Sequence, residues 1–106
     1  MIYIMQGDSY SIPIEISTGE NMFAIDISEL DELEIIIGNI RKTLNKGTIT
    51  FNDGIFYFPI SQKETFSLED GEHDIQVRVK LKDSNNVIGT VTKGICVLPS
   101  KSKAVL

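Results

Sequence analysis

The sequence predicts an all-β domain, an immunoglobulin-like antiparallel β-sandwich of about seven short strands with one or two single helical turns. Two observations support this prediction. Apolar residues recur at every second position, as in Ile12, Ile14 and Ile16, rather than at helical spacing. Turn-forming residues interrupt the apolar segments at short intervals, which is typical of strands joined by hairpins.

Two segments alternate over their whole length and are the clearest strands. Residues 11–17 alternate isoleucine with polar residues and Pro13. Since proline cannot donate a ladder hydrogen bond, this strand is expected at a sheet edge or beside a bulge. Residues 75–82 alternate apolar residues with Gln, Arg and Lys. Three shorter segments between them are rich in β-branched or aromatic residues: 33–37, 48–51 and 55–60.

Turn signals predict how these strands connect. Asn52-Asp53-Gly54 predicts a tight hairpin, and residues 83–86 predict a second hairpin between 73–82 and 87–98. The last of these segments does not alternate cleanly, because Lys93 shares the parity of its apolar residues. A β-bulge at Gly94 would resolve the conflict.

Two segments carry the capping-box pattern of a serine followed three residues later by an acid. Ser61 and Glu64 predict a single helical turn that crosses between strands. Ser28 and Asp31 open residues 28–38, which have the apolar spacing of a helix but also three consecutive isoleucines. The isoleucines favour a strand there, with an amphipathic helix as the alternative.

At 106 residues the chain has the length of one domain. We assign residues 1–98 to the sandwich and residues 99–106 to a C-terminal tail, because Pro-Ser-Lys-Ser-Lys leaves the β pattern. The formal net charge of −5 argues against nucleic-acid binding through phosphate contacts. No apolar run approaches the ~20 residues of a membrane-spanning helix. We therefore expect neither nucleic acid nor membrane as a partner.

Catalytic and metal-binding patterns are not found. The chain has one histidine, His73, and one cysteine, Cys96, on neighbouring predicted strands and without a third orienting group. Cys96 is expected to be a small buried hydrophobe. His73 begins a strand after a corner, where immunoglobulin-like sandwiches often carry a tyrosine that bonds back to the backbone, and its imidazole is expected to do the same. Zinc spacing, EF-hand order and phosphate loops are absent from the sequence. We therefore expect no enzyme, no cofactor and no metal site.

Charge is unevenly distributed along the chain. Residues 1–40 hold eight acidic residues and no Lys or Arg, whereas residues 41–106 hold all ten basic residues and seven acidic ones. One interpretation is two solvated faces that differ in charge. The other is that opposite faces of neighbouring copies meet head to tail, as in a ring. The candidate interface residues are Pro13 at a strand edge, Asp26, Glu29, Asp31 and Glu32 on the acidic side, and Arg78, Lys80 and Lys82 on the basic side.

Four segments carry a family resemblance: 59–71, 75–81, Gln6-Gly7-Asp8, and 87–90 before the last strand and its Lys/Ser tail. They resemble small structural proteins of phages and prophages of Gram-positive bacteria, which are related to immunoglobulin-like modules at the N-termini of phage baseplate proteins. His73 stands where such modules more often carry an aromatic residue. The resemblance implies a non-enzymatic subunit of a tail, baseplate or head–tail assembly. Such a subunit would be made in the bacterial cytoplasm, incorporated into the virion, and bound to copies of itself or to other virion subunits.

A different class of function is open as an alternative. A β-sandwich of this size is also compatible with a module that binds carbohydrate or a cell surface. Sugar platforms need exposed aromatic residues, and the candidates here are Tyr3, Tyr10 and Tyr57.

Overall fold

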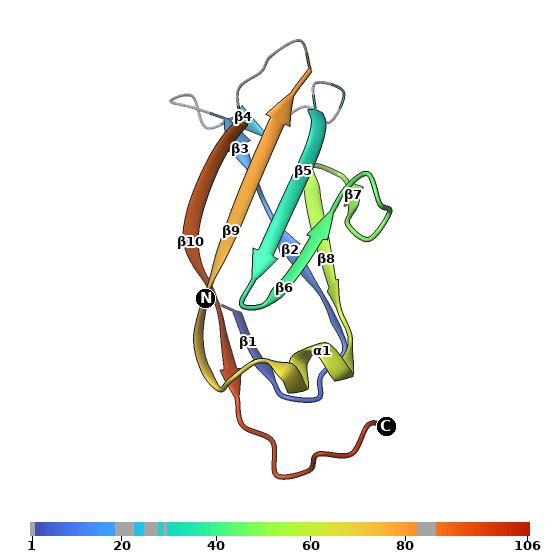
Figure 1. Ribbon diagram of the computed structural model, residues 1–106, viewed down its shortest axis with the longest axis vertical. Coiled ribbons are helices and arrows are strands. Elements are labelled where there is room, and N and C mark those ends of the chain that lie inside the picture. The colour runs from blue at the N-terminus through green and yellow to red at the C-terminus, as the bar shows by residue number, and fades with distance from the viewer. Residues whose placement is uncertain (1, 19–22, 25–27, 29, 83–86) are drawn as a thin grey trace.

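Ten strands and one short helix follow one another in the computed structural model, which describes residues 2–18, 23–24, 28, 30–82 and 87–106 (Figure 1). The strands are β1 (Ile2–Met5), β2 (Tyr10–Ile14), β3 (Ser17–Thr18), β4 (Phe23–Ala24), β5 (Leu30–Ile37), β6 (Ile40–Thr43), β7 (Thr50–Asn52), β8 (Ile55–Ile60), β9 (Gly71–Leu81) and β10 (Val87–Leu98). The helix α1 (Gln62–Ser67) lies between β8 and β9. There are more strands than the predicted seven or so, because β3, β4 and β7 are segments of only two or three residues.

The strands form two principal sheets that pack face to face. The large sheet has the order β1-β10-β9-β5-β6, the small sheet has the order β2-β8-β7, and β3 pairs with β4. Apart from β1, which runs parallel to β10, all described pairs are antiparallel. The orders β10-β9-β5-β6 and β2-β8-β7 match the G-F-C-C′ and B-E-D strands of immunoglobulin-like sandwiches. The predicted fold class is therefore confirmed.

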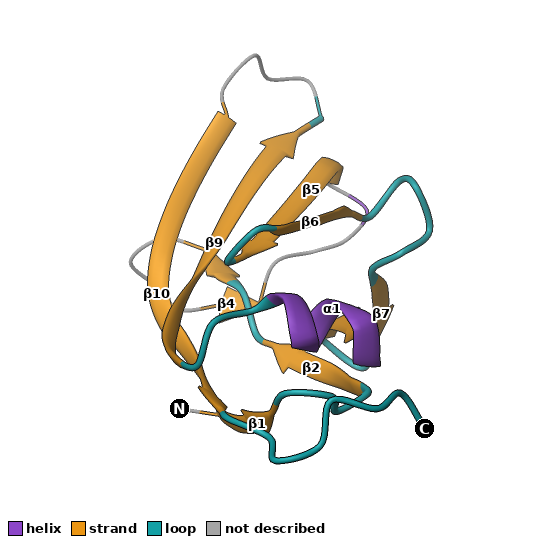
Figure 2. Ribbon diagram, turned by 60° about the horizontal axis from the view of Figure 1, so that its bottom comes forward, coloured by secondary structure: helices purple, strands orange, loops and turns teal. Residues whose placement is uncertain are grey.

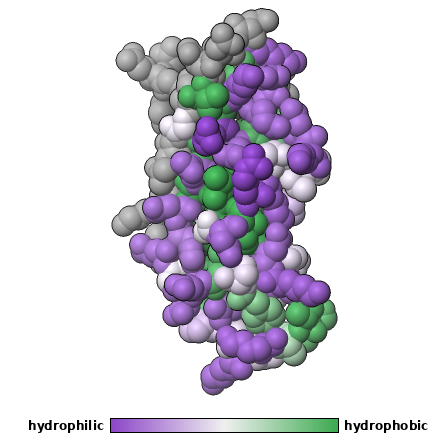
Figure 3. Space-filling view, in the orientation of Figure 1, coloured by the Kyte–Doolittle hydropathy of each residue, from purple (hydrophilic) through white to green (hydrophobic). Residues whose placement is uncertain are grey.

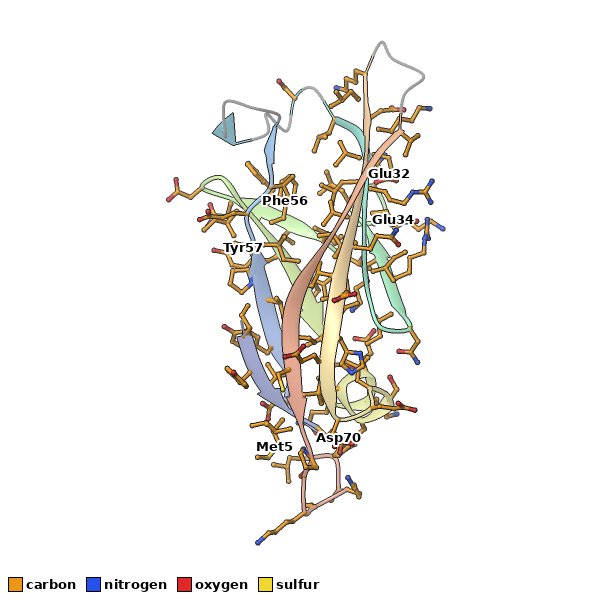
Figure 4. The ribbon with its side chains drawn as sticks, turned by 90° about the vertical axis from the view of Figure 1, so that its left-hand side faces the viewer. Met5, Glu32, Glu34, Phe56, Tyr57 and Asp70 are labelled. Atoms are coloured by element: carbon orange, nitrogen blue, oxygen red, sulfur yellow. The ribbon has the colours of Figure 1, made fainter. Side chains whose placement is uncertain are left out.

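The core lies between the inner faces of the two sheets. On β9, Ile75, Val77 and Val79 are buried, whereas the residues between them point to the outer face. On β8, Phe56 and Phe58 are fully buried and face the large sheet. Figure 4 shows Phe56 between the sheets and Glu34 on the side of the large sheet that faces away from the small one. Strand alternation thus separates the core from the outer face, as the sequence predicts.

Residues 30–37 form a strand, so the strand prediction for this segment is confirmed and the helix alternative is wrong. Leu33, Ile35 and Ile37 are fully buried, whereas Ile36 is half-buried on the outer face. A register shift between Leu30 and Glu32 interrupts the pairing with β9. The helical spacing of the leucines therefore reflects a bulged strand, in which an extra residue changes the parity.

Both predicted hairpins are present. Asn52 pairs with Ile55, and the two residues between them, Asp53 and Gly54, have positive φ angles of 51° and 79°. Two positive φ angles are the signature of the type I′ turn that matches strand twist. In the second hairpin β9 pairs antiparallel with β10, and its connection, residues 83–86, lies outside the described residues.

The predicted bulge in β10 is also present. The register with β9 shifts between Lys93 and Ile95. A Cβ on the buried Gly94 would lie 2.1 Å from Cδ1 of Ile75, so the Ile75 side chain fills the space that a side chain on Gly94 would need. Beyond the bulge Ile95 is buried, whereas Val87 on the other side of it is exposed. The bulge therefore reverses which residues of the strand face the core.

Helix α1 closes one end of the sandwich. The capping box predicted at Ser61 and Glu64 is formed in both directions. The fully buried hydroxyl of Thr65 accepts a bond from the Gly7 N–H (2.9 Å) and donates to the Asp8 carbonyl (2.8 Å). These bonds fasten the helix to the turn between β1 and β2. The second capping-box pattern leads into β5 instead, and Glu29 within it lies outside the described residues.

Residues 99–106 run along this same end without regular structure, as Figure 2 shows with the end turned toward the viewer. The Lys103 ammonium donates to Oε1 of Gln6 at 2.9 Å, and the Leu106 N–H donates to Oε1 of Gln62 at 2.7 Å. The side chain of Leu106 is fully exposed. Polar contacts therefore guide the tail past α1, while its apolar end stays in solvent.

Candidate functional site

The predicted interface residues lie mainly on the outer face of the large sheet. Arg78 and Lys80 are exposed on β9, and Lys82 follows this strand. Asp31 and Glu32 lie on the adjacent β5. The two other acidic candidates, Asp26 and Glu29, lie outside the described residues.

The described acidic and basic candidates share one face, which corrects the expectation that they form opposite faces. The register pairs Glu32 with Lys80, and Lys80 Nζ lies 3.4 Å from Oδ2 of Asp31. The two sets meet because β5 and β9 are hydrogen-bonded neighbours, although the two strands are far apart in the sequence. Part of the charge segregation in the sequence is therefore neutralised within one copy.

Glu34 forms the centre of a cluster that the sequence analysis did not identify. Its carboxylate accepts a hydrogen bond from Nε of Arg41, and its Oε1 lies 3.5 Å from Nη1 of Arg78. The side chain of Glu34 is 12% exposed, against 59% for Arg41 and 53% for Arg78. Among the described residues, neither its Oε1, in spite of the ion pair, nor the buried hydroxyl of its cross-strand neighbour Thr43 has a hydrogen-bond partner. Two half-exposed guanidinium groups thus flank an acid that is largely covered. The signal in the sequence was that Glu34 and Arg78 each alternate with apolar residues and therefore point away from the core. That the two residues are neighbours follows only from the register of β5 with β9.

Lys42, next to Arg41, points to the opposite side of β6. Its ammonium donates to the Pro59 carbonyl at 2.5 Å and to Oε1 of Glu64 at 2.9 Å, and it lies 5.4 Å from the centre of the Phe58 ring. Desolvation acts to raise the pKa of Glu64, but the hydrogen bond from the Ser61 N–H and the Lys42 ammonium together hold this pKa below its ordinary value. The pair joins the edge of the large sheet to β8 and to α1. It is a structural link rather than a reactive site.

His73 occupies the corner that the sequence predicts. Its Nε2 lies 2.6 Å from the Glu69 carbonyl, so the ring nitrogen donates back to the backbone that precedes the strand. A Cβ on Gly38 would lie 3.3 Å from the other ring nitrogen, so the ring also packs closely against the β5–β6 turn. The histidine therefore fixes the passage from α1 into β9.

Cys96 is half-buried, so the expectation of a buried cysteine is wrong. Its register partners are Glu72 on β9 and Tyr3 on β1, both exposed on the outer face. His73 pairs instead with the buried Ile95, and neighbouring residues of a strand point to opposite faces. The thiol and the imidazole are therefore on opposite sides of the sheet, which excludes a Cys–His nucleophilic pair. Within the described part of the chain, no three His, Cys, Asp or Glu side chains are grouped to hold a metal ion.

Exposed apolar side chains gather beside one edge of the outer face. Tyr3 (66% exposed) and Met5 (43%) belong to β1, and Leu98, which pairs with Met5, is 40% exposed. β1 is the outermost strand of the large sheet, and none of its four residues is charged. The Met5 N–H of this strand already donates to Oδ2 of Asp8 at 2.8 Å, and the remaining part of the edge is a template for an added strand.

The neighbouring edge, formed by β2 in the small sheet, has a different character. Pro13 pairs with Tyr57 of β8 and is exposed, so β2 is the edge strand that the sequence predicts. A proline at an edge has no N–H to offer to a further strand. Pro13 therefore weakens this edge as a place for strand addition, while the edge at β1 remains suited to it.

Figure 3 views the molecule from the outer face of the large sheet. This face is mainly hydrophilic, with a narrow hydrophobic strip along its length and a hydrophobic cluster near the C-terminus. Among the described residues, no helix is long and apolar enough to span a bilayer.

Comparisons with known proteins concern the fold alone. No family model matches the sequence, and no curated protein is similar to it. The structure is similar to part of the endo-beta-1,4-mannanase from Thermotoga petrophila, with a TM-score of 0.60 over 94% of this chain and 14% sequence identity. The chain covers 18% of the length of that protein.

Proposed function

We propose that the protein is a non-enzymatic structural subunit of a phage or prophage tail, baseplate or head–tail assembly, which acts through protein–protein contacts. The observation that carries this proposal is the outer face of the large sheet. Charged side chains of both signs stand there beside exposed Tyr3, Met5 and Val87, on a two-sheet scaffold. Mixed charged and apolar surfaces on a rigid scaffold are suited to binding other proteins.

The positions of the reactive side chains support assembly rather than catalysis. His73 is bonded to the backbone at a corner, and Cys96 lies on the other face of the sheet. Lys42 and Glu64 hold α1 against the large sheet. Within the described residues, the contacts of His73, Lys42 and Glu64 stabilise the fold. The outer surfaces are therefore the better candidates for a functional role.

The free edge at β1 supports the same proposal. One side of its backbone is paired with β10 and the other side faces away from it, and its exposed Tyr3 and Met5 would lie beside any added strand. Addition of a partner's extended segment to such an edge is a common mode of assembly.

The decisive experiment asks whether the protein is part of phage particles. Particles from the bacterium that carries the gene are purified after prophage induction and probed with an antibody against the recombinant protein. We expect the protein to co-sediment with particles at a fixed ratio to a major structural protein. Its presence in the lysate but absence from washed particles would contradict the proposal.

The exposed tyrosines keep carbohydrate binding as a second candidate. Tyr3 is 66% and Tyr10 is 47% exposed, whereas Tyr57 is half-buried. Tyr3 belongs to the large sheet and Tyr10 to the small one, so they do not share a single sheet surface. A glycan array, together with a binding assay on soluble mannan, would test this candidate. Absence of binding to either at high protein concentration would eliminate it.

A further inference from the structure

The outward residues of β9, together with the charged residues that flank this strand, change charge sign at its midpoint. The positions before Gln76 are acidic and the positions after it are basic, in the order Asp70, Glu72, Asp74, Gln76, Arg78, Lys80, Lys82. All six charged residues are exposed, and Gln76 at the centre is half-buried. Each acid therefore has a base at the same distance on the other side of Gln76. Figure 4 shows the two ends of this series, with Asp70 near one end of the large sheet and Glu32, the register partner of Lys80, near the other.

Such a pattern is complementary to itself. If two copies pack their large sheets face to face, with a two-fold axis perpendicular to β9 at Gln76, the two β9 strands run antiparallel. Glu72 then faces Lys80 of the other copy, Asp74 faces Arg78, and Asp70 faces Lys82. Because a two-fold contact uses the same patch twice, each of these attractions occurs twice. Rotation about an axis parallel to the strands would instead place like charges opposite each other.

The apolar residues of the neighbouring strands agree with the same arrangement. Val87 is level with Lys80, and Cys96 and Tyr3 are level with Glu72. The operation that places Glu72 on Lys80 therefore also places Cys96 and Tyr3 near Val87 of the other copy. Val87 is 51% and Tyr3 is 66% exposed, so this contact would cover two of the largest exposed apolar side chains.

We infer that the outer face of the large sheet binds a second copy of this chain in a two-fold symmetric dimer centred on Gln76. This inference rests on the proposed function, for which it names the first partner. Two residues of the series, Arg78 and Lys80, also form ion pairs within one copy. Lys80–Asp31 and Arg78–Glu34 have separations of 3.4 and 3.5 Å with half-exposed bases, and Asp74 and Lys82 make no ion pair with a described residue. Lys80–Asp31 is exposed on both sides, and exposed pairs of this kind are weak and can exchange partners.

Two double variants test the inference in trans. Asp70→Lys/Glu72→Lys makes both ends of the series basic, and Lys80→Glu/Lys82→Glu makes both ends acidic. In a homodimer of either variant, like charges meet at four positions. In a one-to-one mixture every facing pair is opposite in sign again. None of the four substitutions touches the buried core or the Glu34 cluster.

The mass of each sample is measured by sedimentation velocity over a concentration series at low and high salt. We expect the wild-type protein to reach the dimer mass, with weaker association at high salt. Each variant alone should self-associate at least about tenfold more weakly, and the mixture should recover the wild-type dimer. A control double variant away from the large sheet, Glu15→Lys/Thr50→Lys, changes one residue directly after β2 and one on β7 and should behave as wild type. Thermal melting confirms that each variant is folded.

Three results would overturn the inference: a wild-type protein that stays monomeric at every concentration and salt, variants that dimerise as wild type does, or a mixture of folded variants that stays monomeric. These outcomes are distinct from failure of the proposed function. A monomer that is nevertheless present in phage particles would refute the symmetric dimer and leave the structural role intact. A dimer that is absent from phage particles would refute the structural role and leave the inference of a symmetric dimer intact.

Discussion

The inner and outer faces of the large sheet differ although neighbouring residues of the same strands build both. On β5, Ile35 is fully buried against the small sheet, whereas Ile36 is half-buried on the outer face. On β6, Lys42 reaches inward to Glu64 and Arg41 reaches outward to Glu34. The inner contact joins the large sheet to α1, whereas the outer ones join hydrogen-bonded strands of the same sheet. Stability therefore resides on the inner face, and the outer face is free to bind partners.

The largest expected difference between the faces is at Ile35 and Ile36. Ile35→Ala removes a fully buried side chain and should lower the free energy of unfolding by about 2–5 kcal/mol. The matched variant Ile36→Ala should lower it by less than about 1 kcal/mol. Urea denaturation measures both values. Equal losses would show that the outer face is packed as tightly as the inner one.

The bulge in β10 offers a second paired comparison. Gly94→Ala places a Cβ 2.1 Å from the Ile75 side chain on the inner face, so Ile75 must move, and we expect a loss of about 1–3 kcal/mol. Gly89→Ala on the exposed side of the same strand meets its nearest atom, Cγ of Arg78, at an ordinary 3.5 Å. Thermal unfolding should show little change for Gly89→Ala. A harmless Gly94→Ala would contradict the account of the bulge.

Removal of the Thr65 hydroxyl is expected to cause the next largest loss of stability. Thr65→Val keeps the shape but leaves the Gly7 N–H and the Asp8 carbonyl without their partner, at a cost of about 1–2 kcal/mol. Ser67→Ala serves as the control, because Ser67 is exposed and donates only within its own helix. Hydrogen exchange at the Gly7 amide should accelerate in the valine variant alone. An unchanged exchange rate would show that this bond does not hold the end of the sandwich.

The smallest expected effect is the pH dependence contributed by Glu64. Its pKa in the folded protein lies below the ordinary value of 4.5. The stabilisation is therefore present above pH 4.5 and is lost as the pH falls through the folded pKa. Because the Glu64 side chain is partly exposed, the contribution should stay under about 1 kcal/mol. Lys42→Met should flatten the acid limb of the stability profile, whereas Arg41→Met on the outer face should change it less. The same acid limb in both variants would contradict the difference between the two faces.

Local patterns in the sequence were sufficient for most of the fold. Alternation placed the core residues of β9, Asp53-Gly54 marked a hairpin, Pro13 marked an edge, and His73 marked the corner. The bulge at Gly94 was visible as a break in parity. Each of these features depends on residues that are close in sequence.

Contacts between segments that are distant in sequence could not be predicted from local patterns. The register between β5 and β9 decides that Glu32 meets Lys80, and nothing in either segment specifies that register alone. The exposure of Cys96 depends on the bulge together with the parallel pairing of β1, which was not foreseen. Residues 40–43 were not predicted as a strand, so the inward position of Lys42 could not be inferred. The candidate site consists mostly of such contacts, and the sequence predicted it less well than the fold.

The most direct test of the central claim, that the outer face of the large sheet binds a second copy of the chain, is a dilution series of amide NMR spectra. As the concentration rises, we predict progressive shift changes for amides of β9, β5 and β10 around Gln76, and stable shifts for β2, β7 and β8 of the small sheet. Changes confined to the small sheet, or spectra independent of concentration, would contradict the account.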